Sequence, residues 1–186
     1  MRLIGPLAVA LALGSPARAE IERNQFSDRE WNVEQLIVPR DWQLNEQRAY
    51  PGILVTAVHR EGHGRVTLAA ERVAGDSGPR EYAARTRAIL VLLGYKVGRA
   101  APHPSGAYLI EATTPAGDMR LRQGTHVAGG IAYVVTLAAP VTAMPSYNRA
   151  FDDVLGHLRL APSNAGQGHD DATAPSNAPT SQPAIP

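Results

Sequence analysis

The chain has 186 residues, of which 18 are basic and 17 acidic, and its formal net charge is +1. This balance, with no basic block, argues against nucleic acid or an anionic membrane as a partner, because either calls for clustered positive charge. The chain contains no cysteine, which excludes disulfide bonds and thiol chemistry, so an exported form would depend on its core alone for stability.

The N-terminus has the pattern of a secretory signal peptide. Arg2 supplies a positive charge, residues 3–13 are mostly apolar, and Ala17 and Ala19 are small residues at the two positions that a signal peptidase reads. The apolar run is too short to span a bilayer. We therefore expect cleavage before Glu20 and an exported protein, periplasmic or secreted, without an integral membrane segment. An uncleaved N-terminal anchor is the alternative.

The first part of the mature chain is predicted to form strands. Residues 33–38, 53–59 and 65–73 are rich in β-branched residues or alternate between apolar and polar side chains. The second and third of these runs are separated by the glycine-rich residues 61–64, which predicts a hairpin.

The hairpin loop raises the question of a metal or acid/base site, because His59, Glu61 and His63 lie within five residues. A helical zinc motif has the order His-Glu-x-x-His, whereas here the glutamate is misplaced, and Gly62 and Gly64 disfavour a helix. We interpret the stretch as a turn. The alternative is a metal-dependent site around His59 and His63 that is completed by a distant ligand.

Two helices are predicted. The first begins at Pro79 and ends near Gly94, both typical positions for these residue types. Its larger side chains recur at helical spacing, namely Tyr82, Thr86, Ile89, Leu90 and Leu93. Its arginines are expected on the solvated face. The second helix begins near Pro145, and its apolar residues are Tyr147, Phe151, Val154, Leu155 and Leu158.

Between the helices the chain is predicted to be extended. The expected strands are residues 95–98, 108–114, 119–123 and 131–137, and the glycine-rich residues 124–130 are interpreted as a hairpin turn. Antiparallel strands joined by short turns, with helices at two points, predict an α+β fold in which an antiparallel sheet is flanked by helices.

Three features of the chain bear a family likeness. A strand runs into Pro-x-x-Trp over residues 37–42, the first helix ends in Gly94-Tyr95, and an aromatic strand at 130–136 precedes a terminal helix within 147–160. Together they resemble the PsbP-like superfamily, which includes the photosystem II accessory protein, DcrB-type bacterial envelope proteins and a Ran-binding nuclear-transport factor. The resemblance spans roughly residues 31–160. It implies an αβα sandwich and a non-catalytic binding or assembly role.

The remaining candidates for chemistry are scattered along the sequence. There is no Gly-x-Ser-x-Gly motif, and Ser77 and Ser105 each precede a glycine in a predicted turn. Asp152 and Asp153 would point about 100° apart on a helix. The other histidines are His103, His126, His157 and His169. The sequence therefore assigns no catalytic residue, no cofactor and no metal ion, and it does not favour an enzyme.

The candidate partner-binding residues are Arg120, Arg122 and Trp31. The two arginines face the same side of a predicted strand and form a candidate patch for an anion or an acidic partner, and an exposed Trp31 could anchor a protein. The expected function is an exported, non-catalytic accessory or binding module of the cell envelope that acts through protein–protein contacts. A small-ligand carrier with a pocket between helix and sheet is the alternative.

The sequence divides into three segments. Residues 1–19 are the predicted signal peptide, and residues 20–162 form a single α+β domain large enough for a real core. Residues 163–186 are rich in Pro, Ala, Ser and Asn, contain only one bulky aliphatic side chain, and are predicted to be a disordered tail.

Overall fold

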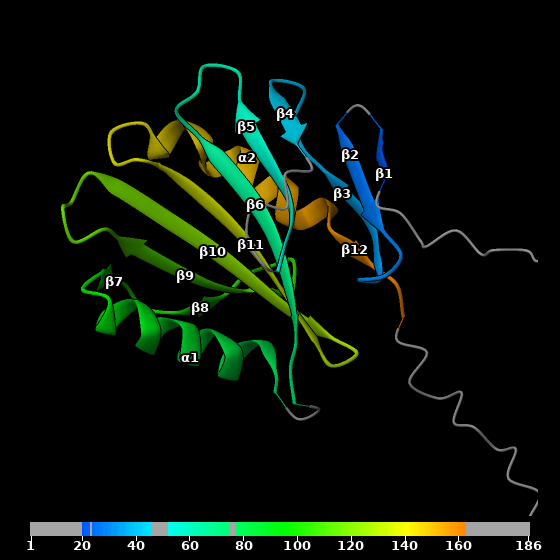
Figure 1. Ribbon diagram of the computed structural model, residues 1–186. Helices are drawn as coiled ribbons and strands as arrows, with labels where there is room; N and C mark the ends of the chain where they lie inside the picture. The colour runs from blue at the N-terminus through cyan, green and yellow to red at the C-terminus, as the bar shows by residue number, and fades with distance from the viewer. Residues whose placement is uncertain (1–19, 23, 46–51, 75–76, 163–186) are drawn as a thin grey trace, which may run out of the picture.

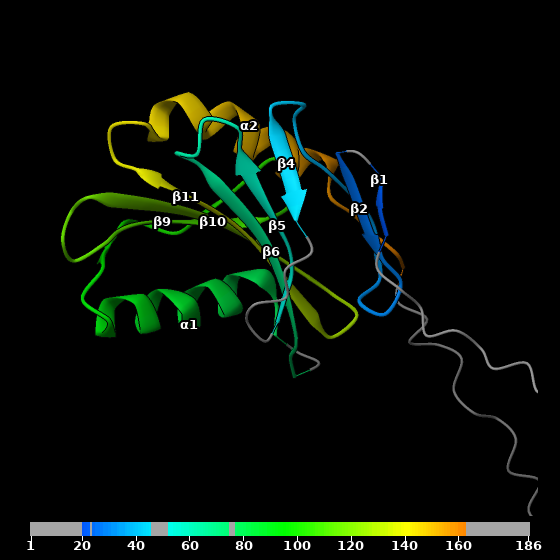
Figure 2. The same ribbon diagram turned by 45° about the horizontal axis from the view of Figure 1, so that its top comes forward.

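The computed structural model describes residues 20–22, 24–45, 52–74 and 77–162. The predicted tail and signal peptide lie outside these ranges. In the described part, a large antiparallel sheet lies between two helices, and a small sheet lies beside it (Figure 1). The molecule therefore has the predicted α+β class, with one helix layer on each face of the large sheet (Figure 2).

The large sheet has the strand order β4-β5-β6-β11-β10-β9-β7, and β8 also pairs with β9. Its strands are β4 (Trp42–Asn45), β5 (Ile53–His59), β6 (Arg65–Arg72), β7 (Lys96–Val97), β8 (Ala101–Pro102), β9 (Tyr108–Thr113), β10 (Met119–Ala128) and β11 (Ile131–Pro140). The small sheet has the order β1-β2-β3-β12. Its strands are β1 (Glu20–Glu22), β2 (Gln25–Asp28), β3 (Val33–Ile37) and β12 (Arg159–Leu160).

The two helices cover opposite faces of the large sheet (Figures 1 and 2). Helix α1 (Pro79–Leu92) packs over β7, β9 and β10, whereas α2 (Met144–His157) packs over β11 and reaches β3. Most of the core lies on the α2 side, where Phe151 and Leu155 meet Tyr133 and Leu137. The core under α1 is much smaller.

Both predicted helices and the main predicted strands are confirmed. The short strands β1, β2, β4, β8 and β12 were not predicted, because runs of two to four residues give too little alternation to detect. The first helix has an unexpected exposure pattern. Ala83 and Leu90 are buried, while Ile89 and Leu93 lie at the predicted helical spacing but are exposed.

The interpretation of residues 124–130 as a hairpin turn is wrong for most of that stretch. Strand β10 continues through Ala128, and only Gly129 and Gly130 form the turn, with φ angles of 58° and 71°. Gly124 lies within β10, paired with Val135 and Leu109, and a Cβ atom there would lie 2.6 Å from a methyl group of Leu155. Glycine is needed at that position for close packing against α2 rather than for a turn.

Candidate functional site

The β5–β6 hairpin loop is a turn, as predicted. The backbone N–H of His59 donates to the Gly64 carbonyl at 2.9 Å, and the N–H of Gly62 donates to the His59 carbonyl at 2.7 Å. The His59 Nε2 atom lies 3.0 Å from Asp41 Oδ2, while His63 is exposed. Within the described residues, no three His, Cys, Asp or Glu side chains are grouped to hold a metal ion.

The ring of His59 belongs to an aromatic cluster between the large sheet and α2. It meets Trp42 nearly edge-on with the ring centroids 5.4 Å apart, and its centroid lies 5.0 Å from that of Tyr147. This histidine thus joins β5, β4 and α2 through packing. His59, a candidate metal ligand in the sequence, is therefore part of the packing between the sheet and α2.

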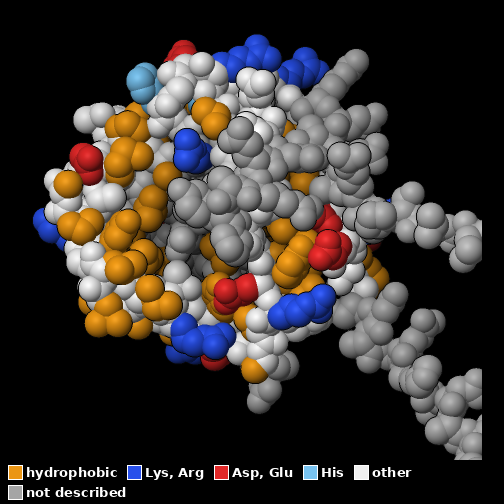
Figure 3. Space-filling model, in the orientation of Figure 1, with side chains coloured by type: hydrophobic (Ala, Val, Ile, Leu, Met, Phe, Trp, Pro, Cys, Tyr) orange, Lys and Arg blue, Asp and Glu red, His pale blue; other side chains and the backbone are white. Residues whose placement is uncertain are grey.

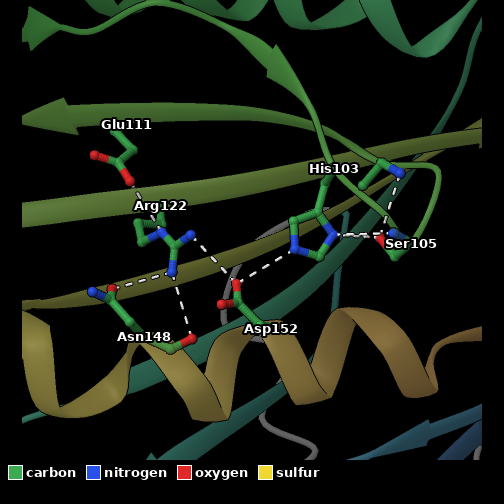
Figure 4. A network of polar contacts seen from close by, with 7 residues as sticks. His103, Ser105, Glu111, Arg122, Asn148 and Asp152 are labelled. Carbon is green, nitrogen blue, oxygen red and sulfur yellow. Dashed lines mark hydrogen bonds and ion pairs between the residues drawn. The ribbon is translucent and has the colours of Figure 1, made fainter.

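A cluster of charged side chains instead lies between α2 and the strands β9 and β10 (Figure 4). At its centre the Arg122 side chain is only 12% exposed. Its Nε atom lies 3.2 Å from Glu111 Oε1, and Nη2 lies 3.3 Å from Asp152 Oδ1. Its Nη1 atom donates to Asn148 Oδ1 at 3.1 Å, and the guanidinium lies 5.0 Å from the centroid of the Phe151 ring.

The local sequence explains this arrangement. Arg122 and Glu111 are direct partners in the β9–β10 ladder, so their side chains project from the same face of the sheet. Asn148 and Asp152 are four residues apart on α2 and therefore lie on one side of the helix. The register of the sheet and the period of the helix bring all four together. Sequence reasoning missed the cluster because no motif links three separate elements.

His103 and Ser105 extend the cluster at its other end. His103 Nε2 lies 3.5 Å from Asp152 Oδ1, and its Nδ1 atom lies 2.9 Å from Ser105 Oγ. The contacts run from Ser105 to His103 to Asp152, as in the catalytic triad of a serine hydrolase. The geometry around Ser105 therefore decides whether it could act as a nucleophile.

The geometry indicates a closed turn rather than a nucleophile. The Nδ1 atom also accepts the backbone N–H of Ser105 at 3.2 Å, and Ser105 Oγ accepts the N–H of Ala107 at 3.4 Å. The Gly106 N–H donates to the His103 carbonyl at 2.9 Å. The amides beside Ser105 are thus engaged within the turn, whereas an oxyanion hole needs such amides to point at the substrate.

His126 lies on the same face of β10 as Arg122, because the two are four residues apart in one strand. Its Nε2 atom is buried and has no hydrogen-bond partner among the described residues. Burial lowers the pKa of His126, and the nearby charge of His103 lowers it further. The neutral imidazole is therefore favoured in the folded protein.

The structure separates the three predicted partner-binding residues. Arg122 lies beneath α2, and its side chain is only 12% exposed. Arg120 is 44% exposed and lies 3.7 Å from Glu111. Trp31 is half-buried against the main core, its carbonyl accepts the Tyr133 hydroxyl at 2.9 Å, and the Arg72 guanidinium lies over its ring.

A cavity between α1 and the large sheet corresponds to the pocket predicted for a carrier. Its volume is about 100 Å³, and Glu71, Tyr82 and Ala132 are among the residues that line it. Ligand pockets usually have volumes of about 300–1,000 Å³. Burial raises the pKa of Tyr82 to about 12, together with its hydrogen bond to Glu71. The cavity suits a few water molecules rather than a ligand.

A second hollow, of about 460 Å³, lies beside the small sheet, where Ser27, Asp28 and Arg29 contribute to its lining. The Asp28 carboxylate is already engaged, because its Oδ1 atom accepts the backbone N–H groups of Glu30 at 3.0 Å and Trp31 at 3.3 Å.

None of the described helices is long and apolar enough to cross a membrane.

Comparison with known proteins identifies the fold but not the activity. No known family model matches the chain, and no curated protein matches it. Among solved structures, cyanobacterial PsbP (CyanoP) from Synechocystis sp. PCC 6803 is 14% identical, with a TM-score of 0.55 over 84% of this chain and 99% of that chain. LpqN of Mycobacterium tuberculosis, described as involved in cell envelope biogenesis, is 17% identical, with a TM-score of 0.51 over 81% of this chain and 88% of that chain.

Identities this low define architecture rather than function. The agreement covers most of each chain, and it matches the αβα layering seen in Figure 2. The resemblance expected from the sequence is therefore confirmed at the level of architecture: the protein has the PsbP-like fold.

Proposed function

We propose that the protein is an exported, non-catalytic binding module of the cell envelope that holds a protein partner at a charged strip formed by Glu111, Arg120, Arg122 and Asp152. The N-terminal signal pattern supports export. LpqN, a protein of similar fold, is described as involved in cell envelope biogenesis, which supports the same compartment.

The observation that carries the proposal is the prearranged geometry of the strip. Glu111, Arg120 and Asp152 are 45%, 44% and 44% exposed, while Arg122 beneath them is 12% exposed and pairs with both carboxylates. Arg122 thus holds the exposed charges in place before a partner arrives. Binding to charged side chains that are already held in place costs less side-chain entropy than binding to mobile ones. The alternation of positive and negative charge favours a partner with the complementary pattern.

Trp31 has no contact role in this proposal. Its half-buried ring packs on the main core, near Tyr133 at the start of β11, whereas Arg120 is paired with Ala139 near the end of that strand. One small contact area centred on the charged strip would not reach it.

The test is site-specific photo-crosslinking in cells that naturally express the protein. A benzophenone amino acid replaces Arg120 in one variant and Arg60, which is exposed in the β5–β6 turn, in the control. We expect a discrete adduct with a single envelope protein from position 120 only. Arg120→Glu should then weaken binding of that partner by about tenfold or more, while Arg60→Glu should not. Adducts of equal yield from both positions, or none from position 120, would contradict the proposal.

A further inference from the structure

The solvent-facing side of α1 is apolar near its C-terminal end. Ile89, Val91, Leu92 and Leu93 are 57%, 50%, 86% and 62% exposed, and we call these four residues the α1 patch. In Figure 3 hydrophobic side chains gather at the lower left, where Figure 1 shows the end of α1. Single exposed aliphatics are ordinary, but four within five residues form a contiguous feature that calls for an explanation.

The α1 patch contributes little to the core of the protein. The inner side of the helix is already packed by Ala83 and Leu90, which meet Ile110 and Ala112 of β9. Leu92 points about 160° away from Leu90 around the helix axis. Ala84 and Ala88 lie on the outer side of the helix and are also exposed. The helix therefore has an inner apolar face for the sheet and an outer one without a partner among the described residues.

The charges along this segment of the chain are strongly biased. Between residues 79 and 99 there are five basic residues and one acidic residue, Glu81, and all six are exposed. The basic residues are Arg80, Arg85, Arg87, Lys96 and Arg99. Elsewhere between residues 20 and 162 there are eleven basic and fourteen acidic residues. The near-zero charge of the whole chain hides this positive segment, and the occupant of the α1 patch should be anionic.

We propose that α1 docks the protein on an anionic lipid surface. In this arrangement the α1 patch enters the boundary between headgroups and acyl chains, while Arg80, Arg85 and Arg87 contact lipid phosphates. A second copy of the chain is disfavoured, because pairing through α1 would bring two positive segments together. The most exposed side chain, Leu92, protrudes from the surface, and a bilayer can accept a protruding apolar side chain without a preformed groove.

The orientation that results is compatible with partner binding. Because α1 and α2 cover opposite faces of the large sheet (Figure 2), a molecule lying on a membrane through α1 presents the α2 face to the aqueous side. The charged strip lies on that face. The two proposals rest on different surfaces and can fail separately.

The test is co-sedimentation of the mature chain, starting at Glu20, with vesicles. One set contains equal parts of phosphatidylglycerol and phosphatidylcholine, and the other only phosphatidylcholine. We expect binding to the anionic vesicles at about 0.05 M salt and much weaker binding at about 0.5 M. Arg80→Glu with Arg85→Glu should reduce affinity at least about tenfold. The matched control is Arg29→Glu with Arg60→Glu, which makes the same change in net charge at exposed positions outside α1 and should bind like the wild type.

A neutral double variant tests the apolar contribution. Ile89→Ser with Leu92→Ser removes exposed side chains only, so circular dichroism should show an unchanged fold, and binding to anionic vesicles should be lost. Three results would overturn the proposal: no binding of the wild type to anionic vesicles, equal loss in the Arg29/Arg60 control, or full binding of the serine variant. Binding to native envelope membranes but not to pure lipid would also overturn it and would assign the α1 patch to a membrane protein.

Discussion

Gly124 determines how closely α2 approaches β10. A Cβ atom at this position would lie 2.6 and 2.7 Å from the two methyl groups of Leu155, which is itself 1% exposed. We predict that Gly124→Ala lowers the free energy of unfolding by about 1–3 kcal/mol, because the core must shift to accept a methyl group. Urea denaturation followed by circular dichroism measures this change.

Gly156 is the matched control for that substitution. It lies in α2 one residue after Leu155, and an added Cβ atom would meet nothing within 4 Å. Gly156→Ala should therefore raise the free energy of unfolding by about 0.5–1 kcal/mol, because alanine favours the helix. If both variants changed stability in the same direction, the close approach at Gly124 would not be the cause.

At the scale of elements, Arg122 joins α2 to the sheet through ion pairs with Glu111 and Asp152 and through its position over Phe151. We predict that Arg122→Ala lowers the free energy of unfolding by about 1–3 kcal/mol. The loss would leave two carboxylates facing each other across the interface and remove packing from the ring. Thermal and urea unfolding of the variant would show the change.

Arg120 provides the comparison at this scale, because it is exposed and only 3.7 Å from the same glutamate. An exposed pair of this kind contributes little, so Arg120→Ala should change the free energy of unfolding by less than about 0.5 kcal/mol. Similar losses for both arginines would show that burial beneath α2 does not distinguish them. A small effect of Arg120→Ala on stability also makes it suitable for binding tests.

At the scale of the whole molecule, the end of the domain is joined to its beginning. Strand β12 pairs with β3, and the N–H of Ala161 donates to the Asn32 carbonyl at 2.9 Å. We propose that the folding unit ends at Pro162. A chain of residues 20–162 should melt within about 2 °C of residues 20–186, whereas ending at Leu158 should lower Tm by at least about 5 °C. Equal melting of the chains ending at 158 and 162 would show that β12 is dispensable.

Local signals in the sequence were sufficient for the larger elements. Residues 53–59 and 65–73 alternate or are β-branched, and the strands appear almost where expected. The sequence predicts the turn at 61–64 because Gly62 and Gly64 disfavour the helix that a His-Glu-x-x-His zinc motif requires. The same local reasoning was wrong at Gly124, because a glycine needed for packing against Leu155 looks in sequence like a glycine needed for a turn.

The sequence by itself determined the fold class, the two helices and the main strands, because those features depend on the period of apolar residues along a short segment. Only the tertiary structure decided which charges meet and which apolar residues stay exposed. Glu111, Arg122 and Asp152 come together through strand register and helix packing. Ile89 and Leu93 belong to the same predicted apolar series as Leu90, yet only Leu90 is buried. Their exposure follows from how narrow a strip of α1 meets the sheet. Such contacts join residues far apart in the chain, and no local pattern encodes them.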